Sequence, residues 1–253
     1  MSTPRIYETV VDMAKAIRQG TGNGDLAHLD IGAGTGDLIV ELSRHVGLRS
    51  EACDFHVERF PLSGKVPIRR TNINQEPLPY PDQSFDLVTS TEVIEHLENP
   101  RLFLREIARV LRPGGHAILS TPNVLNLKSR VRYLGSGFFN LFGPLPLPGG
   151  MDEKFSANSH ISPVSYFYLA HGLHCAGFRS LDMATDKAQK TSVLWLALLW
   201  PLILALWPFF WLKESRLKGT NAWTRDERVR AIVKGHMSWR LLTGRTLIVC
   251  ARK

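Results

Sequence analysis

The sequence predicts an α/β fold built on a parallel, doubly wound sheet. Three observations lead to it. Short apolar segments alternate with amphipathic helical segments from residue 26 to 123, the first apolar segment enters a glycine-rich turn that opens a helix, and a later helix closes in Pro-Gly-Gly before another apolar segment. With 253 residues, 44% of them hydrophobic, the chain can form one large domain over 1–253.

The elements follow in order along the chain. A helix is expected after Pro4, and Asp37 begins the helix behind the glycine turn. Residues 85–97 are expected to form a strand that runs into a turn and a helix. The other expected strands are 50–55, 66–73, 116–123, 178–185 and 244–253, and the other helices are 99–115 and 162–178. Residues 125–160, rich in Gly, Pro and aromatic residues, predict an irregular lid.

Cysteine use and the first residues indicate the compartment. Cys53, Cys175 and Cys250 lie far apart, without the spacing of a zinc site or a disulfide framework, which fits a reducing cytoplasm. The first twenty residues mix acids and bases and contain no long apolar stretch, so no signal peptide is expected.

The glycine turn has the composition of a ligand-binding loop. In HLDIGAGTGD, glycines stand at 32, 34 and 36, and glycine permits positive φ and a close ligand approach. A dinucleotide fingerprint needs GxGxxG, so this spacing argues against NAD. A tight turn without any ligand stays open as an alternative. Asp54, at the end of the second strand, is expected to accept hydrogen bonds from ribose hydroxyls, with Glu51 as a competing choice nearer the strand entry.

Several motifs together resemble a class I S-adenosylmethionine-dependent methyltransferase. They are LDIGAGTGD, Asp54, TNINQEPLPYPDQSFDLV, EVIEHL, LREIARVLRPGGHAILSTPN and GRTLIVCARK, and the resemblance covers residues 26–186 and 244–253. It implies a Rossmann-like seven-stranded sheet in which the seventh strand runs antiparallel between the fifth and sixth. It also implies S-adenosylmethionine as the cofactor. The implied cofactor-binding residues are Asp30, Gly32, Gly34, Gly36, Asp54, Asn72, Ile73 and Glu92, with Asn72 and Ile73 at the adenine.

The EVIEH segment brings two carboxylates and an imidazole together. Glu92, Glu95 and His96 are spaced to project from one face at the carboxyl edge of the sheet, where such a cluster needs solvent or a cation. The segment is similar to that of ubiquinone-pathway O-methyltransferases and of enzymes that methylate the 2′-hydroxyl of small RNAs. The latter resemblance implies a Mg²⁺ or other divalent metal site made by Glu92, Glu95, His96 and His160.

The metal site has alternatives. Glu92 can contact only the cofactor, Glu95 can cap a turn or form a salt bridge, and His96 can act alone as the base. His96 and Glu95 are the expected catalytic residues, because an attacking hydroxyl must lose its proton during methyl transfer.

Residues 193–212, VLWLALLWPLILALWPFFWL, form an apolar run long enough to span a bilayer. Because the sixth and seventh strands on either side should pair in one sheet, the chain must return to the side it left. Pro201 and Pro208 favour a break or kink, and Trp195, Trp200, Trp207 and Trp211 favour the headgroup boundary. Residues 188–243 are therefore expected to form a membrane-associating helical insertion, re-entrant or in-plane, with a buried core or dimer-interface helix as the alternative.

The charge distribution supports the lipid interpretation. From Lys187 onward there are 13 Lys or Arg and 3 Asp or Glu, a net +10, whereas residues 1–186 hold 18 and 20, a net −2. The apolar run is flanked by Lys187, Lys190, Lys213, Arg216 and Lys218, which favours anionic lipid and makes nucleic acid an unlikely partner. A merely solvated basic surface is the alternative.

The expected function is methyl transfer to a hydroxyl of a lipid-linked glycan, a glycolipid or a prenylated ring at the cytoplasmic face of the cell membrane, by a peripheral or monotopic protein. N- or C-methylation of a soluble metabolite, and a non-catalytic membrane-docked binding protein, are the alternatives. The acceptor and the oligomeric state are not specified by the sequence.

Overall fold

The computed structural model describes residues 3–21, 24–145, 159–216 and 226–253, with residues 207 and 209–216 described by their backbone alone. Its centre is a seven-stranded sheet in the order β3-β2-β1-β4-β5-β7-β6. β7 pairs antiparallel with both β5 and β6, and the other pairs are parallel. The expected seven-stranded sheet with an antiparallel last strand is therefore confirmed. The strands are β1 Leu26–Ile31, β2 Leu48–Asp54, β3 Ile68–Arg70, β4 Phe85–Thr91, β5 Leu111–Pro122, β6 Ser180–Thr185 and β7 Thr246–Arg252.

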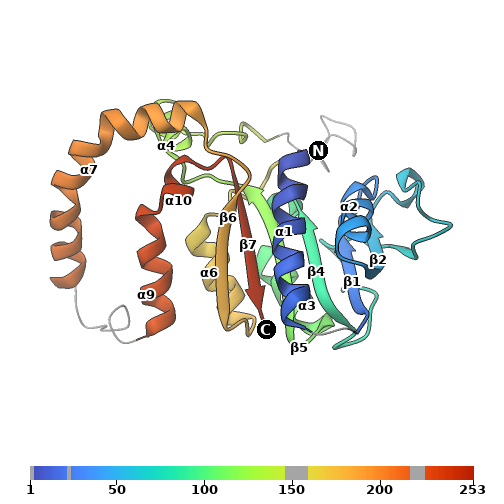
Figure 1. Cartoon of the computed structure of the whole chain (residues 1–253). Coiled ribbons are helices and arrows are strands. Elements are labelled where there is room, and N and C mark those ends of the chain that lie inside the picture. The colour runs from blue at the N-terminus through green and yellow to red at the C-terminus, as the bar shows by residue number, and fades with distance from the viewer. Residues whose placement is uncertain (1–2, 22–23, 146–158, 217–225) are drawn as a thin grey trace.

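Helices cover both faces of the sheet (Figure 1). On one face, α1 and α2 pack over β4, β5 and β7 through a cluster that includes Ile6, Val10 and Leu42. On the other face, α3 and α6 pack through a larger cluster that includes Phe103 and Leu169. The helices and 3-10 turns are α1 Pro4–Gly20, α2 Asp37–His45, η1 Val57–Arg59, η2 Ile94–His96, α3 Pro100–Val110, α4 Leu127–Ser136, α6 Tyr166–Cys175, α7 Lys190–Arg216, α9 Glu227–Lys234, η3 Gly235–Met237 and α10 Trp239–Thr243.

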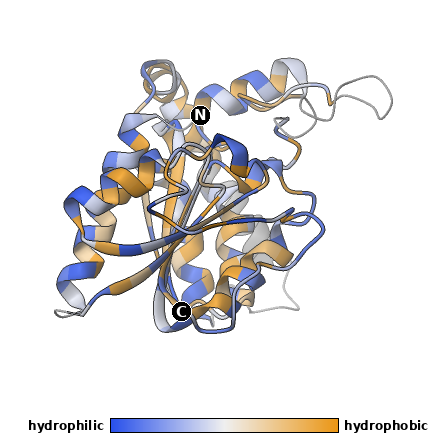
Figure 2. Ribbon diagram, turned by 90° about the vertical axis from the view of Figure 1, so that its right-hand side faces the viewer, coloured by the Kyte–Doolittle hydropathy of each residue, from blue (hydrophilic) through white to orange (hydrophobic). Residues whose placement is uncertain are grey.

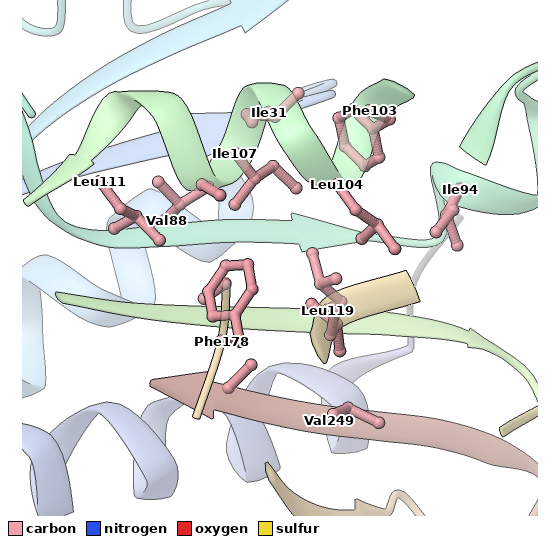
Figure 3. Close-up of a cluster of buried hydrophobic side chains, with 14 of the residues drawn as sticks. Ile31, Val88, Ile94, Phe103, Leu104, Ile107, Leu111, Leu119, Phe178 and Val249 are labelled. Carbon is pink, nitrogen blue, oxygen red and sulfur yellow. The ribbon is translucent and has the colours of Figure 1, made fainter. Parts of the chain in front are cut away.

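The core follows from the apolar strands that the sequence contains. All six residues of β1 are buried, as expected of a central parallel strand covered on both faces. In Figure 3, α3 lies along the sheet with Leu104 and Ile107 directed at β4 and β5. The central strands are largely orange in Figure 2, while blue segments lie on the outer parts of the helices.

The strand order places the site. The chain reverses its winding between β1 and β4, and ligands bind at the carboxyl ends of strands at such a switch point. The glycine turn follows β1 there, and the EVIEH segment follows β4. Both motifs therefore meet at one edge of the sheet.

Three local predictions were wrong. EVIEH does not open a helix, because only a 3-10 turn, Ile94–His96, forms before Asn99 caps α3 through its side chain. β5 begins at Leu111 rather than at residue 116, with a register irregularity opposite Phe85 and Leu87. The segment 125–160 is not irregular at its start: Asn126 caps α4, which ends at Ser136 and is followed by Gly137 with positive φ. Residues 146–158 of that segment lie outside the described residues.

The segment predicted to insert into membrane leaves the sheet and returns to it at one point. Gln189 N–H donates to the Thr243 carbonyl at 2.8 Å, and Ala188 forms a β-bridge with Gly244. Between these ends, α7 projects away from the sheet and changes direction along its length (Figure 1). The expected return is confirmed. Of the expected break or kink at the prolines, the structure shows a bend and no break, because Pro201 and Pro208 both lie inside one continuous helix.

Among the residues whose side chains are described, no helix carries an apolar stretch long enough to cross a bilayer.

Candidate functional site

The glycine turn behind β1 forms an open cradle. Gly32, Gly34 and Gly36 have φ of 73°, 54° and 77°, a region that residues with a Cβ rarely adopt. A Cβ on Gly32 would lie 2.4 Å from Val93, whereas one on Gly34 would meet no atom within 4 Å. Gly34 therefore borders empty space at the carboxyl edge of β1, as a loop that receives a ligand must.

Asp54 closes this cradle from β2. Its Oδ2 accepts a hydrogen bond from Gly34 N at 2.9 Å, and its Oδ1 accepts one from His56 N at 2.7 Å. Glu51 lies three residues earlier and pairs in register with Leu29, inside the strand. The position at the carboxyl end belongs to Asp54, as expected for a residue that faces ribose hydroxyls. The ribose contact itself stays a prediction.

Asn72 and Ile73 follow β3 at the same edge, and both are half-buried. The Asn72 Oδ1 accepts a hydrogen bond from Asn74 N at 3.2 Å, so this side chain already holds the turn. A carbonyl oxygen has a second lone pair, which leaves room for the expected adenine contact. The adenine assignment stays a prediction.

Asp30 is 2% exposed and lies two residues before Gly32. Burial raises its pKa to about 7; the hydrogen bond that Thr89 donates to its Oδ1 at 2.7 Å opposes this rise, and the charge of Asp54 adds to it. Its ionisation is therefore balanced near neutral pH.

Glu92 sits in a strained backbone conformation at the end of β4. Its φ is 54°, rare for a residue with a side chain. Its N–H lies 3.1 Å from both the carbonyl and the hydroxyl oxygen of Ser120, which hold it there. Burial raises its pKa, and the positive charge of Arg245 opposes the rise. Strain of this kind collects at functional sites, which agrees with the expected cofactor contact.

Glu95 is fully buried, and neither of its carboxylate oxygens has a hydrogen-bond partner among the described residues. Burial raises its pKa to about 8, and the charge of Glu92 adds to the rise. The Thr121 hydroxyl and the Glu95 backbone N–H lie near enough to moderate the rise, but neither meets hydrogen-bond geometry. A buried carboxyl group without partners needs a proton or a cation.

His96 and His160 face each other beside Glu95, with ring centroids 4.8 Å apart. The His96 Nδ1 lies 3.0 Å from the Ser159 carbonyl, and the His160 Nδ1 lies 3.0 Å from the Leu141 carbonyl. A carbonyl accepts only, so both rings carry hydrogen on Nδ1 and leave Nε2 with a lone pair. Burial lowers the pKa of both rings, so both are neutral at pH 7.

Backbone contacts bring His160 to this place. Ile161 N and Ser162 N both donate to the Glu95 carbonyl at 2.9 Å, although they lie 66 and 67 residues after it in sequence. From the sequence alone, His160 could only be matched to the later His of the RNA-methylating enzymes by its place between the fifth strand and the next helix. The contact depends on the backbone of residues 161 and 162, just before α6.

The ligand atoms of Glu95, His96 and His160 lie within 4.8 Å of one another. Glu92 is outside this group, so three of the four expected metal ligands come together. Their donor set fits a divalent cation, since a neutral imidazole with its other nitrogen bound to a carbonyl is the usual metal-ligating form. Metal binding itself stays a prediction.

Two residues near the site were not foreseen from the sequence. Asp186, after β6, accepts from Thr246 N at 3.0 Å. Together with Arg245 it acts on the pKa of Glu92 from the β6–β7 side. Both flank a long insertion in the sequence, and only the pairing of β6 with β7 brings them together.

Comparison with known proteins identifies the chemistry of this edge. Residues 29–119 match a family described as "Methyltransferase domain". A demethylmenaquinone methyltransferase of Lactobacillus johnsonii is 35% identical over 173 residues, 62% of this chain and 69% of that protein. That of Chlorobaculum parvum is 30% identical over 202 residues, 76% of this chain and 81% of that protein. A probable S-adenosylmethionine-dependent methyltransferase of Mycolicibacterium smegmatis is 46% identical over 101 residues, only 38% of this chain and 37% of that protein.

Solved structures agree on the fold. A SAM dependent methyltransferase from Archaeoglobus fulgidus aligns with a TM-score of 0.56 at 19% identity, covering 98% of this chain and 94% of that one. The [4+2]-cyclase SpnF aligns with 0.52 at 20% identity, covering 97% and 80%. Because a methyltransferase and a cyclase share this fold, the structural similarity supports the fold and does not indicate the activity. The relatives that match over more than two thirds of their length, with the glycine cradle at the switch point, decide the family: the chain belongs to the class I S-adenosylmethionine-dependent methyltransferases.

Proposed function

We propose that the protein transfers a methyl group from S-adenosylmethionine to a hydroxyl of an acceptor with an apolar tail, at the cytoplasmic face of a membrane. The acceptor classes are a lipid-linked glycan, a glycolipid or a prenylated ring. The observation that carries the proposal is the exposed apolar surface of α7, which starts beside the reactive edge of the sheet.

From Val193 to Leu206, the exposed side chains of α7 are all apolar. Leu194, Leu198, Leu202 and Leu206 follow one another at intervals of four, with 60%, 62%, 55% and 42% of their surfaces exposed. Residues four apart lie on one face of a helix. Trp200, which is 40% exposed, adds an amphipathic ring of the kind that favours the headgroup boundary. Water is a poor environment for such a stripe, whereas an acyl layer suits it.

α4 extends this surface toward the site. Leu134 is 88% exposed and Tyr133 49%. α4 is joined to α7 by Ser192, whose Oγ lies 3.2 Å from both Lys128 N and Asn126 Oδ1. Phe138, Leu141 and Leu145 continue the apolar surface after α4.

The charges on this surface have one sign. Residues 124–145 and 187–213 contain no Asp or Glu, and the exposed bases near the two helices are Arg130, Arg132, Lys187 and Lys190. Among the described residues these bases form no salt bridge, and apolar side chains next to such bases complement a bilayer with anionic headgroups. Five more residues were expected to contribute to lipid binding, and their side chains lie outside the described residues: Trp207, Trp211, Lys213, Arg216 and Lys218.

The exposed apolar residues of α7, of α4 and of the segment 138–145, together called the docking surface, adjoin the reactive residues. Leu141 accepts the Nδ1 hydrogen bond of His160, and the Phe142 ring lies 5.3 Å from the His160 ring. His160 in turn contacts His96. An acceptor whose tail stays in the lipid can therefore reach this edge with its head.

The chain supplies a base and a positioned acid at this edge. S-adenosylmethionine, when bound, supplies an electrophilic methyl group on sulfur. The free Nε2 of His96 can take the proton of the attacking hydroxyl, because the ring is neutral at pH 7. Glu95, buried beside it, stabilises positive charge when it is ionised. Orientation of the acceptor by the surrounding walls supplies the remainder.

The alternative to His96 acting as the base is a divalent metal held by Glu95, His96 and His160, in which case the His96 Nε2 would be a ligand and could not take the proton. What supports it is the pair of unpartnered Glu95 oxygens together with the two free Nε2 atoms. When bound, such an ion would lower the pKa of an acceptor hydroxyl. Isothermal titration of Mn²⁺ into the protein and into Glu95→Gln tests it, with equal weak binding by both as the result against it.

A second candidate function is C-methylation of a quinone ring. The named activity of the demethylmenaquinone methyltransferases that align over more than two thirds of their length favours it. Both candidates require an apolar-tailed acceptor and a base, so the membrane surface and His96 serve either one.

The acceptor experiment separates these candidates. The protein is incubated with S-adenosyl[methyl-¹⁴C]methionine and a total membrane-lipid extract, with and without EDTA, and the labelled products are analysed by mass spectrometry. A methoxyl group in a lipid product supports O-methylation, and a methyl group on a ring carbon supports the second candidate. Label confined to the aqueous fraction would overturn the lipid acceptor.

The docking surface is tested with vesicles of phosphatidylcholine and phosphatidylglycerol. Leu198→Asp combined with Leu202→Asp should reduce co-sedimentation at least tenfold, on the order expected for two lost apolar anchors and added anionic repulsion. Leu102→Asp is the matched control, since Leu102 is 47% exposed on α3, away from this surface. Unchanged vesicle binding of the double variant, with loss of a dimer in sedimentation velocity, would assign α7 to a second copy of the chain instead.

A further inference from the structure

Four polar side chains in the middle of the sheet form a continuous hydrogen-bonded chain that the methyl transfer described above does not use. The His28 Nδ1 lies 2.9 Å from Ser50 Oγ, and its Nε2 lies 2.8 Å from Thr89 Oγ1. Thr89 Oγ1 lies 2.7 Å from Asp30 Oδ1. The chain therefore runs from β2 through β1 to β4 and returns to β1 at the edge of the cofactor cradle.

Strand register builds this arrangement. His28 and Asp30 are two residues apart on β1, so their side chains share one face of the sheet. Ser50 is the register partner of His28, and Thr89 is that of Asp30. His28 and Thr89 are both 0% exposed and Asp30 is 2% exposed. Polar groups buried this deeply depend on one another for hydrogen bonds.

The direction of each bond follows from counting hydrogens. Burial lowers the pKa of His28 to about 3, so the ring is neutral and carries one N–H. Ionised Asp30 can only accept hydrogen bonds, so the Thr89 hydroxyl must donate its one hydrogen to the Asp30 carboxylate. Thr89 must then accept from Nε2–H of His28, and the bare Nδ1 accepts from the Ser50 hydroxyl. All three bonds point toward Asp30.

We propose that His28 is a positioning residue that, in its Nε2–H tautomer, fixes the Thr89 hydroxyl as a donor to Asp30 and so keeps this carboxylate charged beside the cofactor turn. The opposite tautomer would draw the Thr89 hydrogen to Nε2 and leave ionised Asp30 without a donor. The cofactor is a cation at its sulfur, so a charged Asp30 favours its binding. His28 thus acts on the cofactor through two intervening side chains.

None of the other titratable groups described near Asp30 can replace the Thr89 hydroxyl as the hydrogen-bond donor to its carboxylate. Asp54, on β2, adds a negative charge that disfavours ionisation of Asp30. Burial raises the pKa of Cys53 far above its usual range, so it stays a neutral thiol. On β4, Thr89 supplies the hydrogen bond that lowers the Asp30 pKa. On β1, His28 is the neighbour that orients Thr89.

The test is the dissociation constant of S-adenosylmethionine for the full chain between pH 6 and pH 9, by isothermal titration. Thr89→Val should weaken binding about tenfold at pH 7, the size of a hydrogen bond to a charged group, and Thr89→Ser should restore it. His28→Leu should weaken binding in the same direction, and His28→Gln, which retains an N–H donor, should recover part of the loss. At pH 9 the variants should agree with the unaltered protein within about twofold, because Asp30 is then ionised in all of them.

Two results would overturn the proposal. Equal weakening by Thr89→Val at pH 7 and pH 9 would indicate a structural effect without any link to charge. Independently of any variant, ¹⁵N NMR of the unaltered protein at pH 8 should find the hydrogen of His28 on Nε2; a hydrogen on Nδ1 would contradict the assigned direction.

Discussion

Replacing Glu95 by Gln should change how the stability of the metal-free protein depends on pH. Glu95 is fully buried, its oxygens have no partner among the described residues, and its folded pKa is raised to about 8. In the unfolded chain the carboxyl group has its ordinary pKa of 4.5. Between these values the folded state holds a proton that the unfolded state releases, so stability falls as pH rises.

The size of the effect has a clear ceiling. The difference between 4.5 and about 8, at about 1.36 kcal/mol for each pKa unit, corresponds to about 5 kcal/mol at pH 9. Relaxation and water entry reduce this figure, so a loss of about 2 to 4 kcal/mol is expected. Below pH 4.5 the contribution is fully present, and above the folded pKa it is lost. Glutamine cannot ionise, so the variant lacks this dependence.

The assay is urea unfolding of both proteins with EDTA, from pH 5 to pH 9. The stability of Glu95→Gln relative to the unaltered protein should rise across this range, and Mn²⁺ at pH 8 should stabilise the unaltered protein alone. Glu106→Gln is the control that should show no pH dependence over this range, because Arg109 lowers the pKa of Glu106 from 4.5 and its contribution to stability therefore changes only below pH 4.5. A constant difference between Glu95→Gln and the unaltered protein from pH 5 to pH 9 would refute the reasoning.

Two further predictions concern the cofactor cradle and the base. Gly34→Ala should weaken S-adenosylmethionine binding at least tenfold in isothermal titration. Gly47→Ala is the control and should leave binding unchanged: both glycines have positive φ and open space around a Cβ, so both variants carry the same backbone strain of about 1 kcal/mol. Equal losses of affinity in the two variants would assign the effect to strain. In a profile of kcat against pH, the acid limb should lie below pH 6.5, because burial lowers the pKa of His96 and only its neutral form accepts a proton. An acid limb above pH 6.5 would contradict this role. His96→Gln should lower kcat by about 10² to 10⁴ while the affinity for the cofactor is retained.

The sequence specified the cofactor edge well, because its residues are local to strand ends. Asp30 and the glycines belong to one turn, and Asp54 ends the next strand, so strand order alone predicts that they meet. The antiparallel β7 followed from the family resemblance rather than from any pattern in the strand itself. Periodicity cannot report strand direction.

The remainder depends on contacts that no local pattern encodes. The His28 chain requires the register of three strands at once, and His28 alone reads as an ordinary packed residue. α4 was missed because Gly135, Gly137 and the aromatic residues around them dominate the composition, while Asn126 supplies the cap. The burial of Glu95 depends on the segment at 161–162, whose backbone binds the Glu95 carbonyl.

The junction between α4 and α7 can be tested as the connection between the membrane surface and the sheet. Ser192 is 0% exposed and contacts both Lys128 N and Asn126 Oδ1, while Asn126 also caps α4 through Ser129 N at 2.9 Å. Ser192→Ala should leave the Lys128 N–H without its side-chain acceptor and lower the free energy of unfolding by about 1 to 3 kcal/mol. Hydrogen exchange should accelerate in 127–136 while the strands keep their protection.

Ser90→Ala is the matched comparison for Ser192→Ala, since Ser90 is 2% exposed and its hydroxyl has no partner among the described residues. It should cost little, because no hydrogen bond is lost with the hydroxyl. If vesicle binding falls with Ser192→Ala and is unchanged in Ser90→Ala, α4 and α7 act as one docking surface whose geometry this serine maintains. Unaltered exchange in 127–136 would instead mean that each helix is held by its own packing, and the route from the lipid to His96 would then depend on Phe142 and His160 alone.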